Sequence, residues 1–517
     1  MIKFPICLVL ACFLAFGTGC QSTTFEKTTK PNLVYIICDD LGYGDVSAFN
    51  PEGKIATPNI DRLADEGMMF TDAHTTSSVC TPTRYNVLTG RYNWRTDLKS
   101  GVLNGYGPPL IDEDRLTFAS LLRDHGYQTA MIGKWHLGMD LPFVDEAGRG
   151  KAIDWSRPIG RTPTSNGFDY FWGHGASLDF PPYVYIENNR YTSTNVSVKS
   201  KKDLGIDCVF RTGPIADNFD PFTTLDEFCD RSAAYIQDWD GEKPFALYVP
   251  LTSPHTPILP TGEWDGKSGI NNYVDFVMQT DAGVGKILDA LDARGITGNT
   301  IVVFTSDNGC SPRADFKTLE AHGHQANGIF RGAKADIWEG GHRVPHIVRW
   351  PAKVEPGTRS DRLTLLGDIV ATMADIVGAD FAPDEAEDSV SFYATLTGQE
   401  EDPSTKHQAI INHSVNGTFA VRTKEWKLCF SAGSGGWAEP KDKQALAMGL
   451  PKYQLYNMVN DPEESNNLYE KHPEIIEQLT EIGTQIVVNG RSTPGEPQPN
   501  DTANDWRQLD WMKDAGQ

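Results

Sequence analysis

Two apolar runs of this sequence are each followed at once by residues of the types that bind hard metal ions. Asp39 and Asp40 come immediately after residues 32–38, and Asp307 and Asn308 follow a similar run. We interpret both runs as strands buried on both faces, which are typical of a parallel sheet. The carboxyl ends of such strands meet at one edge, so three carboxylates and an amide oxygen would gather there and suit Ca²⁺ or Mg²⁺. Because a single aspartate would more often form a turn, this prediction depends on the two pairs together.

Basic side chains follow other predicted strands or lie in the loops near them. Lys134 and His136 follow one strand, His255 follows another, and Lys334 lies in a loop ahead of a second glycine-rich segment. A lone lysine is usually a solvated charge, and a lone histidine is usually structural. Two of each at the same strand ends would hold a tetrahedral oxyanion and supply acid and base groups near neutral pH.

A cysteine stands just ahead of a predicted helix that begins near Pro82. In the segment Cys80-Thr81-Pro82-Thr83-Arg84, Pro82 is typical of a first helical turn, and backbone N–H groups there favour an anion. Cys80 could be a thiol nucleophile, half of a disulfide, a metal ligand, or the precursor of another residue.

This segment resembles the Cys-x-Pro-x-Arg core of the formylglycine-dependent sulfatases. Thr83 stands where many members have serine, which is a mild change. Other segments resemble further signatures of the family in the expected order, namely residues 31–45, 88–92, 133–138, 304–309, 339–345 and 455–468. Each motif alone is weak, but the set is highly specific.

The resemblance implies an alkaline-phosphatase-like fold and a modified residue at position 80. A maturation enzyme would oxidise Cys80 to Cα-formylglycine during export, and the working form would be its hydrate, a geminal diol. Arg84 matches the residue that steadies this diol. One Ca²⁺ ion would be bound by the modified Cys80, a sulfate oxygen and four side chains: Asp39, Asp40, Asp307 and Asn308.

The resemblance also implies roles for the basic residues. Lys134 and Lys334 would bind sulfate oxygens, and His255 would protonate the leaving oxygen of the sugar or aryl group. His136 would take the proton of the second diol hydroxyl, so that sulfate departs and the aldehyde returns. These roles match the needs of a sulfate monoester, which are an in-line nucleophile and positive charge around its equatorial oxygens.

The other three roles of Cys80 fit the site less well. A disulfide would give no role to a helix N-terminus that faces an acidic metal site. A thiolate ligand suits softer ions than an oxygen-rich site selects. A thiol nucleophile would form a thiosulfate ester with no easy exit. We therefore predict that the encoded cysteine is a precursor.

The elements that must position these residues alternate between strands and helices. Strand-like apolar runs occur at 32–38, 130–132, 245–249, 300–304 and 346–349, and helical patterns occur at 60–66, 116–125 and 273–294. Asn59 is a candidate N-cap of the first helix. The alternation predicts an α/β fold with a mostly parallel central sheet and helices on both faces.

A segment rich in proline, glycine and aromatic residues interrupts this alternation at 140–231, where we expect long loops on the main domain. Its aromatic side chains either stack on sugar rings or pack the loops. They are Tyr170, Phe171, Trp172, His174, Phe180, Tyr183 and Tyr185. Arg161, Arg190 and Arg211 could bind neighbouring sulfates or uronates, although solvated arginines are the commoner case.

Four parts are predicted along the chain. Residues 1–20 resemble a signal peptide of the lipoprotein type with Cys20 as the lipidated residue, and 21–30 would be a tether. Residues 31–396 would form the sulfatase catalytic domain, and 397–517 a smaller α+β C-terminal subdomain and tail. This organisation predicts an exported protein, either periplasmic or anchored to a membrane as a lipoprotein.

Composition narrows the class of protein further. The net charge of −23 over 517 residues argues against nucleic-acid binding, which needs a basic face. Of nine cysteines, six lie beyond the predicted leader without the dense spacing of a disulfide scaffold. Cys208 and Cys229, which flank a loop-rich stretch, are the one pair that could form a disulfide.

The predicted function is hydrolysis of sulfate monoesters, with a sulfated saccharide as substrate. A phosphatase or phosphonate hydrolase on the same scaffold is one alternative. The other is a lipoprotein that binds sulfated glycans without turning them over, against which the complete set of catalytic residue types argues.

Overall fold

The computed structural model describes Met1, residues 30–145 and residues 152–514. The predicted signal peptide after Met1 and positions 21–29 of the predicted tether lie outside the described residues. Within residues 30–145 and 152–514, no helix is long and apolar enough to cross a membrane.

A ten-stranded sheet forms the centre of the molecule, with β1 in its interior. β1 pairs in parallel with β10 and β11, and β4 and β5 continue the parallel part, whereas β12 pairs antiparallel to β11. The strands in spatial order are β13 (Thr358–Ser360), β2 (Met68–Phe70), β12 (His346–Arg349), β11 (Thr300–Ser306), β1 (Asn32–Asp39), β10 (Phe245–Pro254), β4 (Gln128–Lys134), β5 (Tyr170–His174), β6 (Ile186–Glu187) and β7 (Arg190–Tyr191). The mostly parallel sheet predicted from the sequence is therefore confirmed.

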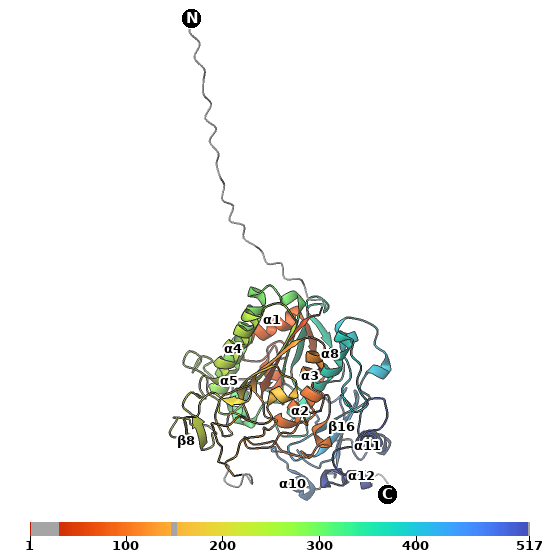
Figure 1. Cartoon of the computed structure of the whole chain (residues 1–517). Coiled ribbons are helices and arrows are strands. Elements are labelled where there is room, and N and C mark those ends of the chain that lie inside the picture. Colours follow the sequence, from red (N-terminus) through yellow and green to blue (C-terminus); the bar gives the residue numbers. More distant parts are fainter. Residues whose placement is uncertain (2–29, 146–151, 515–517) are drawn as a thin grey trace.

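Helices cover both faces of this sheet. Figure 1 shows α1, α4 and α5 together on one side and α2, α3 and α8 on the other, in agreement with the helix–helix contacts. Their bounds are α1 (Pro58–Glu66), α2 (Cys80–Thr89), α3 (Phe118–Asp124), α4 (Thr224–Asp238), α5 (Asn272–Ala293) and α8 (Ile369–Val377). The α/β class expected from the alternation is confirmed.

The start of α1 differs from the prediction. The helix begins at Pro58, so Thr57 is its N-cap residue and Asn59 lies inside the first turn. Proline favours the first helical position because it has no N–H to leave unpaired. The carboxylate of Asp281 on α5 accepts the backbone N–H groups of Asn59 and Ile60 instead, at 3.0 and 2.9 Å.

The segment predicted as long loops contains more strand than expected. Its residues supply β5, β6 and β7 at one edge of the main sheet and a separate hairpin of β8 (Val196–Lys199) with β9 (Gly213–Ala216). Most of its aromatic rings are buried, as in the stack of Trp172 on Tyr185 with centroids 4.5 Å apart. The buried rings pack against other parts of the protein and are not available to stack on sugar rings. Only Tyr170 and Phe180, among the aromatic residues singled out from the sequence, are partly exposed.

Cys208 and Cys229 are both free, so the suggested disulfide is wrong. Cys229 is fully buried on α4, and its Sγ lies against Gly283 of α5, where an added Cβ would be 2.5 Å away. The cysteine fills the space at this helix crossing, and glycine permits the close approach.

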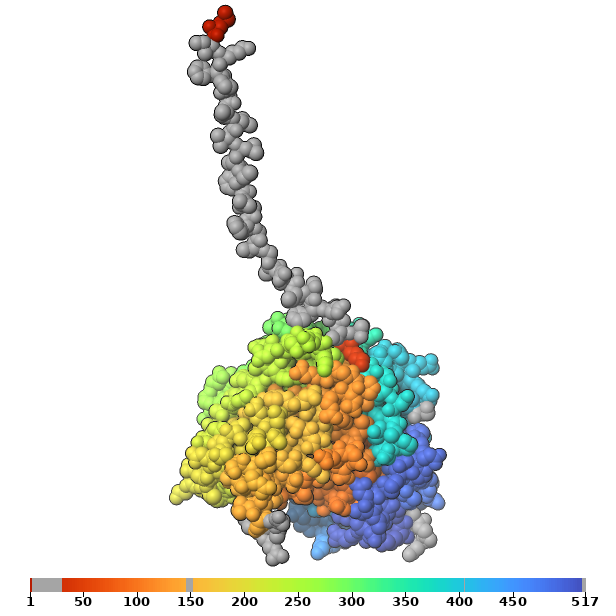
Figure 2. All heavy atoms as spheres, in the orientation of Figure 1, coloured from red at the N-terminus to blue at the C-terminus, as the bar shows by residue number. Residues whose placement is uncertain are grey.

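A second, smaller sheet forms the core of the C-terminal region. Four antiparallel strands are covered by α11 (Pro473–Val488), and Figure 2 shows these residues in blue beside the rest of the molecule. The strands are β15 (Ile410–His413), β16 (Phe419–Arg422), β17 (Trp426–Cys429) and β18 (Gln454–Asn457). This sheet and its helix confirm the smaller α+β arrangement predicted for the C-terminal region. The domain boundary at 396/397 stays a prediction.

Buried charges join the small sheet to the main domain. Lys427 of β17 lies with its Nζ 2.8 Å from Glu464 Oε1 and 3.1 Å from Glu339 Oε1, and Arg422 of β16 pairs with Asp72 at 3.0 Å. We call this set the interdomain charge cluster. Its three acids and three bases are Asp72, Glu339, Glu464, Arg343, Arg422 and Lys427.

Two histidines adjoin this cluster without making it a metal site. His74, His342 and Glu339 are close enough to share an ion, but the ammonium of Lys427 lies 2.9 Å from His342 Nε2. The lysine therefore already occupies the place that a cation would take.

Candidate active site

The two acidic pairs meet at the carboxyl edge of the sheet. β1 and β11 run in parallel with Cys38 opposite Ser306, so the residues that follow each strand emerge side by side. Asp40 adopts a left-handed backbone conformation with φ of 67°, which aspartate tolerates better than most residues. Its N–H lies 3.4 Å from Asp307 Oδ1, which fixes the two loops against each other.

The oxygen atoms of this edge fit a hard cation. Ligand atoms of Asp39, Cys80 and Asp307 all lie within 4.8 Å of one another, and Asp39 and Asp40 form a second such group with His255. Asp39 Oδ1 and Asn308 Oδ1 are buried without a hydrogen-bond partner. Buried oxygens are rarely left unpaired, so these atoms point to a ligand.

Three basic side chains neutralise the three carboxylates. Arg84 lies 2.7 Å from Asp307, Lys334 lies 2.6 Å from Asp40, and Lys134 forms an ion pair with Asp39. The formal charges of these six groups cancel. A bound divalent cation would therefore leave two units of positive charge at the site, which attracts an anionic ester.

The carboxylates differ in their proton affinity. Burial alone would raise the pKa of Asp39, but the charges of Lys134, His255 and Arg84 hold it well below its usual range. Burial and the neighbouring Asp39 carboxylate raise the pKa of Asp307 to about 6. A bound cation would reduce the repulsion between these neighbouring carboxylates.

Helix α2 presents Cys80 to this edge. The helix begins at Cys80 itself, two residues earlier than predicted, and its N-cap residue Val79 provides no side-chain cap. The first-turn N–H groups of α2 are thus not taken by a cap side chain, and their dipole favours an anion. Burial raises the pKa of the Cys80 thiol to about 11, although Lys134 and Lys334 lower it.

His136 is held in a single tautomer. Its Nε2–H donates to the carbonyl of Leu103 at 2.8 Å, and its buried Nδ1 has no hydrogen-bond partner. Burial and the charges of Lys134 and Arg84 keep the pKa of His136 well below its usual value. A neutral ring with a free Nδ1 lone pair can accept a proton.

His255 has the opposite arrangement. Its Nδ1 hydrogen-bonds the carbonyl oxygen of Thr256, so Nδ1 is the donor. Nε2 faces the acidic edge, 3.8 Å from Asp40 Oδ2 and 3.4 Å from Ser177 Oγ. All the site residues predicted from the sequence are therefore brought together at one edge.

Sequence reasoning missed Ser177. Its hydroxyl lies 3.3 Å from Lys134 Nζ and within hydrogen-bond reach of His255. Ser177 follows β5 by three residues, so the same strand-end argument could have found it if β5 had been recognised.

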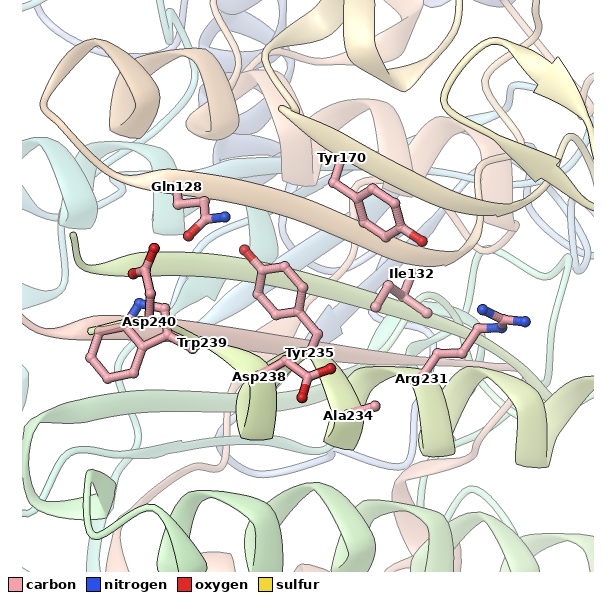
Figure 3. Close-up of a pocket in the computed structure, with 9 residues that line it drawn as sticks. All are labelled: Gln128, Ile132, Tyr170, Arg231, Ala234, Tyr235, Asp238, Trp239 and Asp240. Carbon is pink, nitrogen blue, oxygen red and sulfur yellow. The ribbon is translucent and has the colours of Figure 1, made fainter. Parts of the chain in front are cut away.

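Of the three arginines singled out in the inserted segment, Arg211 is the one linked to the site. Its guanidinium stacks on Phe180 at 3.9 Å, and the Phe180 ring is 6.1 Å from that of His136. Arg161 instead donates to the carbonyl of Ile111, and Arg190 is exposed on β7. A surface pocket between α4 and strands β4 and β5 contains none of the site residues (Figure 3).

A centre of oxygen ligands, lysines and histidines at the carboxyl edge of a mostly parallel sheet is suited to an enzyme of the α/β class that hydrolyses a tetrahedral oxyanion ester. Comparison with known proteins assigns the family. The Sulfatase family model matches residues 31–379, and the model of the C-terminal region of N-sulphoglucosamine sulphohydrolase matches residues 330–487. The chain belongs to the sulfatase family, and the predicted family and enzyme class, a sulfuric ester hydrolase, are confirmed.

Individual relatives agree with this assignment. The chain is 32% identical to an N-acetylgalactosamine-6-O-sulfatase of Bacteroides thetaiotaomicron, with 91% of this chain and 96% of the relative covered. It is 30% identical to a human steryl-sulfatase, with 78% and 77% covered. A solved structure from work on glycosaminoglycan metabolism by Bacteroides thetaiotaomicron superposes with a TM-score of 0.77 at 32% identity, covering 89% of this chain and 99% of the other.

Proposed function

We propose that this protein hydrolyses sulfate monoesters of a sulfated saccharide by means of formylglycine at position 80 and one Ca²⁺ ion. The observation that carries the proposal is the meeting of Cys80 with Asp39 and Asp307 within 4.8 Å, at the edge where Lys134 and Lys334 pair with Asp39 and Asp40. The name of the 32% identical N-acetylgalactosamine-6-O-sulfatase supports a saccharide substrate. A saccharide is also consistent with the partly exposed Phe180 beside His136 and the exposed Arg211 that stacks on it.

The encoded thiol is poorly suited to be the nucleophile. A reactive cysteine needs a lowered pKa, because the thiolate is the attacking species. Burial instead raises the pKa of Cys80 to about 11. The Cys-x-Pro-x-Arg segment of residues 80–84 supports its conversion to formylglycine by a maturation enzyme.

The basic residues then have separate tasks. When bound, Ca²⁺ and the formylglycine hydrate would supply charge neutralisation and two hydroxyl groups, and Asp39, Asp40, Asp307 and Asn308 would hold the ion. Lys134 and Lys334 balance the charge of the sulfate oxygens, and Arg84 holds Asp307 in place at 2.7 Å. His255 gives a proton to the leaving oxygen through Nε2. His136 receives a proton at its free Nδ1, which allows sulfate to leave.

The alternative reaction is hydrolysis of phosphate esters. Sulfate and phosphate share tetrahedral geometry, but a phosphate monoester carries more negative charge near neutral pH. The match of the Sulfatase family model to residues 31–379 favours the sulfate ester. Paired assays with the sulfate and phosphate esters of one aryl alcohol separate the two, and faster turnover of the phosphate would reverse the assignment.

We also propose export. The predicted leader and Cys20 support a periplasmic or lipid-anchored location. Mass spectrometry of the mature N-terminus tests this, since a lipidated Cys20 and an ordinary cleaved terminus differ in mass.

Metal removal is expected to abolish turnover and to lower the melting temperature. Without the ion, Asp39 and Asp307 face each other in a buried site, and a ligand that binds only the folded state at 100 times its Kd adds about 2.7 kcal/mol of stability. Assays and thermal unfolding after exhaustive chelation, with and without added Ca²⁺, measure both effects. Asn308→Ala should need more Ca²⁺ for the same recovery. Full activity in the chelated protein would exclude the metal.

Replacing His255 with alanine is expected to slow hydrolysis about 10²- to 10⁴-fold for a sugar sulfate, the usual contribution of a general acid. The effect should be much smaller for an aryl sulfate with an acidic leaving group, because such an oxygen departs without a proton. Comparing kcat for the two substrates tests this. His322→Ala, at an exposed histidine, is the control. Equal losses on both substrates would contradict the acid role.

A further inference from the structure

One loop of the C-terminal subdomain lies directly against the loop that carries Lys334. An added Cβ at Gly436 would lie 2.1 Å from the carbonyl oxygen of Ala335, so the two backbones touch. Ala335 in turn donates its N–H to Ser78, two residues before Cys80, at 2.8 Å. Residues 434–438, here called the rim loop, thus contact a segment that is hydrogen-bonded to the loop before Cys80.

A buried carboxylate fixes the rim loop in place. Asp336, which is 1% exposed, accepts the backbone N–H groups of Trp437 and Ala438 at 2.8 and 2.9 Å. Its second oxygen accepts the N–H of Ala333 at 3.0 Å. The same side chain therefore ties the residues that flank Lys334 to the backbone of Trp437.

The indole of Trp437 is left in solvent by this arrangement. Its residue is 50% exposed, and it is the only aromatic among the large apolar side chains that are strongly exposed in the described residues. Single exposed apolar residues are common, but this one stands on a rigid backbone next to the site. A rigid support lowers the ordering cost of binding, and an indole offers an apolar face with a polar edge.

We propose that Trp437 is a platform for the sugar unit next to the sulfated unit of a saccharide substrate. The apolar face of that sugar ring would stack on the indole, while the sulfate lies between Lys134 and Lys334. This inference rests on the proposed function and adds that substrate recognition extends beyond the sulfated unit. Trp437 would be a specificity residue without contact to the reacting atoms.

Binding to protein that cannot turn over its substrate tests this platform. In the Cys80→Ala background, dissociation constants are measured for a sulfated tetrasaccharide containing N-acetylgalactosamine 6-sulfate and for the free monosaccharide N-acetylgalactosamine 6-sulfate. Adding Trp437→Ala should weaken tetrasaccharide binding about tenfold, which corresponds to about 1.4 kcal/mol. Binding of the monosaccharide should change less than twofold. Trp437→Phe should recover most of the loss.

Kinetics with active protein give the second measurement. Trp437→Ala should raise KM for the tetrasaccharide about tenfold with kcat nearly unchanged, and should not affect an aryl sulfate. Val459→Ala removes another strongly exposed apolar side chain of the same subdomain and is the matched control. Equal weakening of both saccharides, or no weakening of either, overturns the platform. Tetrasaccharide binding without turnover by the parent enzyme would instead refute only the proposed hydrolysis.

Discussion

Replacing Cys80 with alanine is expected to lower sulfate ester hydrolysis by at least about 10³-fold, because it removes the proposed nucleophile. Folding should be nearly unaffected, since alanine fits the space of the small buried side chain at the start of α2. Turnover of an aryl sulfate and the melting temperature of the purified variant measure the two effects.

The parent protein should carry the modification itself. Trypsin releases residues 63–84 as one peptide. That peptide should have lost one sulfur and two hydrogens and gained one oxygen, the change from thiol to aldehyde. Cys229→Ala, at another buried free cysteine, should retain activity. An unmodified thiol in fully active, exported protein would disprove the mechanism.

Replacing Lys427 with methionine is expected to destabilise the protein by about 3–5 kcal/mol, the usual cost of removing one partner of a buried ion pair. Its ammonium is fully buried and is shared between Glu339 and Glu464 at 3.1 and 2.8 Å. Without it, two carboxylates face each other between the two sheets. Chemical denaturation gives the change in unfolding free energy.

This loss should depend on pH. Burial and the nearby Glu339 already raise the pKa of Glu464 to about 7, and removal of Lys427 raises it further. A raised pKa favours the protonated folded state, so the deficit should be smaller at pH 5 and grow as pH rises towards 8. Lys424→Met, at a half-exposed lysine of the same hairpin, should cost at most about 1 kcal/mol. Equal effects of the two substitutions would mean that burial does not matter here.

The candidate active site at the carboxyl edge of the sheet could be predicted because short stretches of sequence determine where its residues lie. A buried strand followed by an acidic pair predicts that the pair lies at the carboxyl end of that strand. The parallel pairing of β1 with β11 then brings the two acidic pairs together. Lys134 is the last residue of β4, and His255 directly follows β10. The resemblance to a family then added roles that spacing alone does not give.

The parts that were missed depend on contacts between distant segments. The partners Asp72 and Arg422 are 350 residues apart, and no local pattern marks either one. The proximity of Trp437 to Lys334 depends on a glycine contact across two subdomains, which no sequence pattern reports.

The burial of Cys80 has a consequence for the order of events during biosynthesis. The side chain is 2% exposed and lies within a helix whose residues are all buried, so a second enzyme cannot reach it in the finished fold. If the residue matures as proposed, modification must come before α2 closes. A chain that folds first would then keep an unmodified, inactive thiol. The yield of active enzyme would depend on the rate of modification relative to the rate of folding.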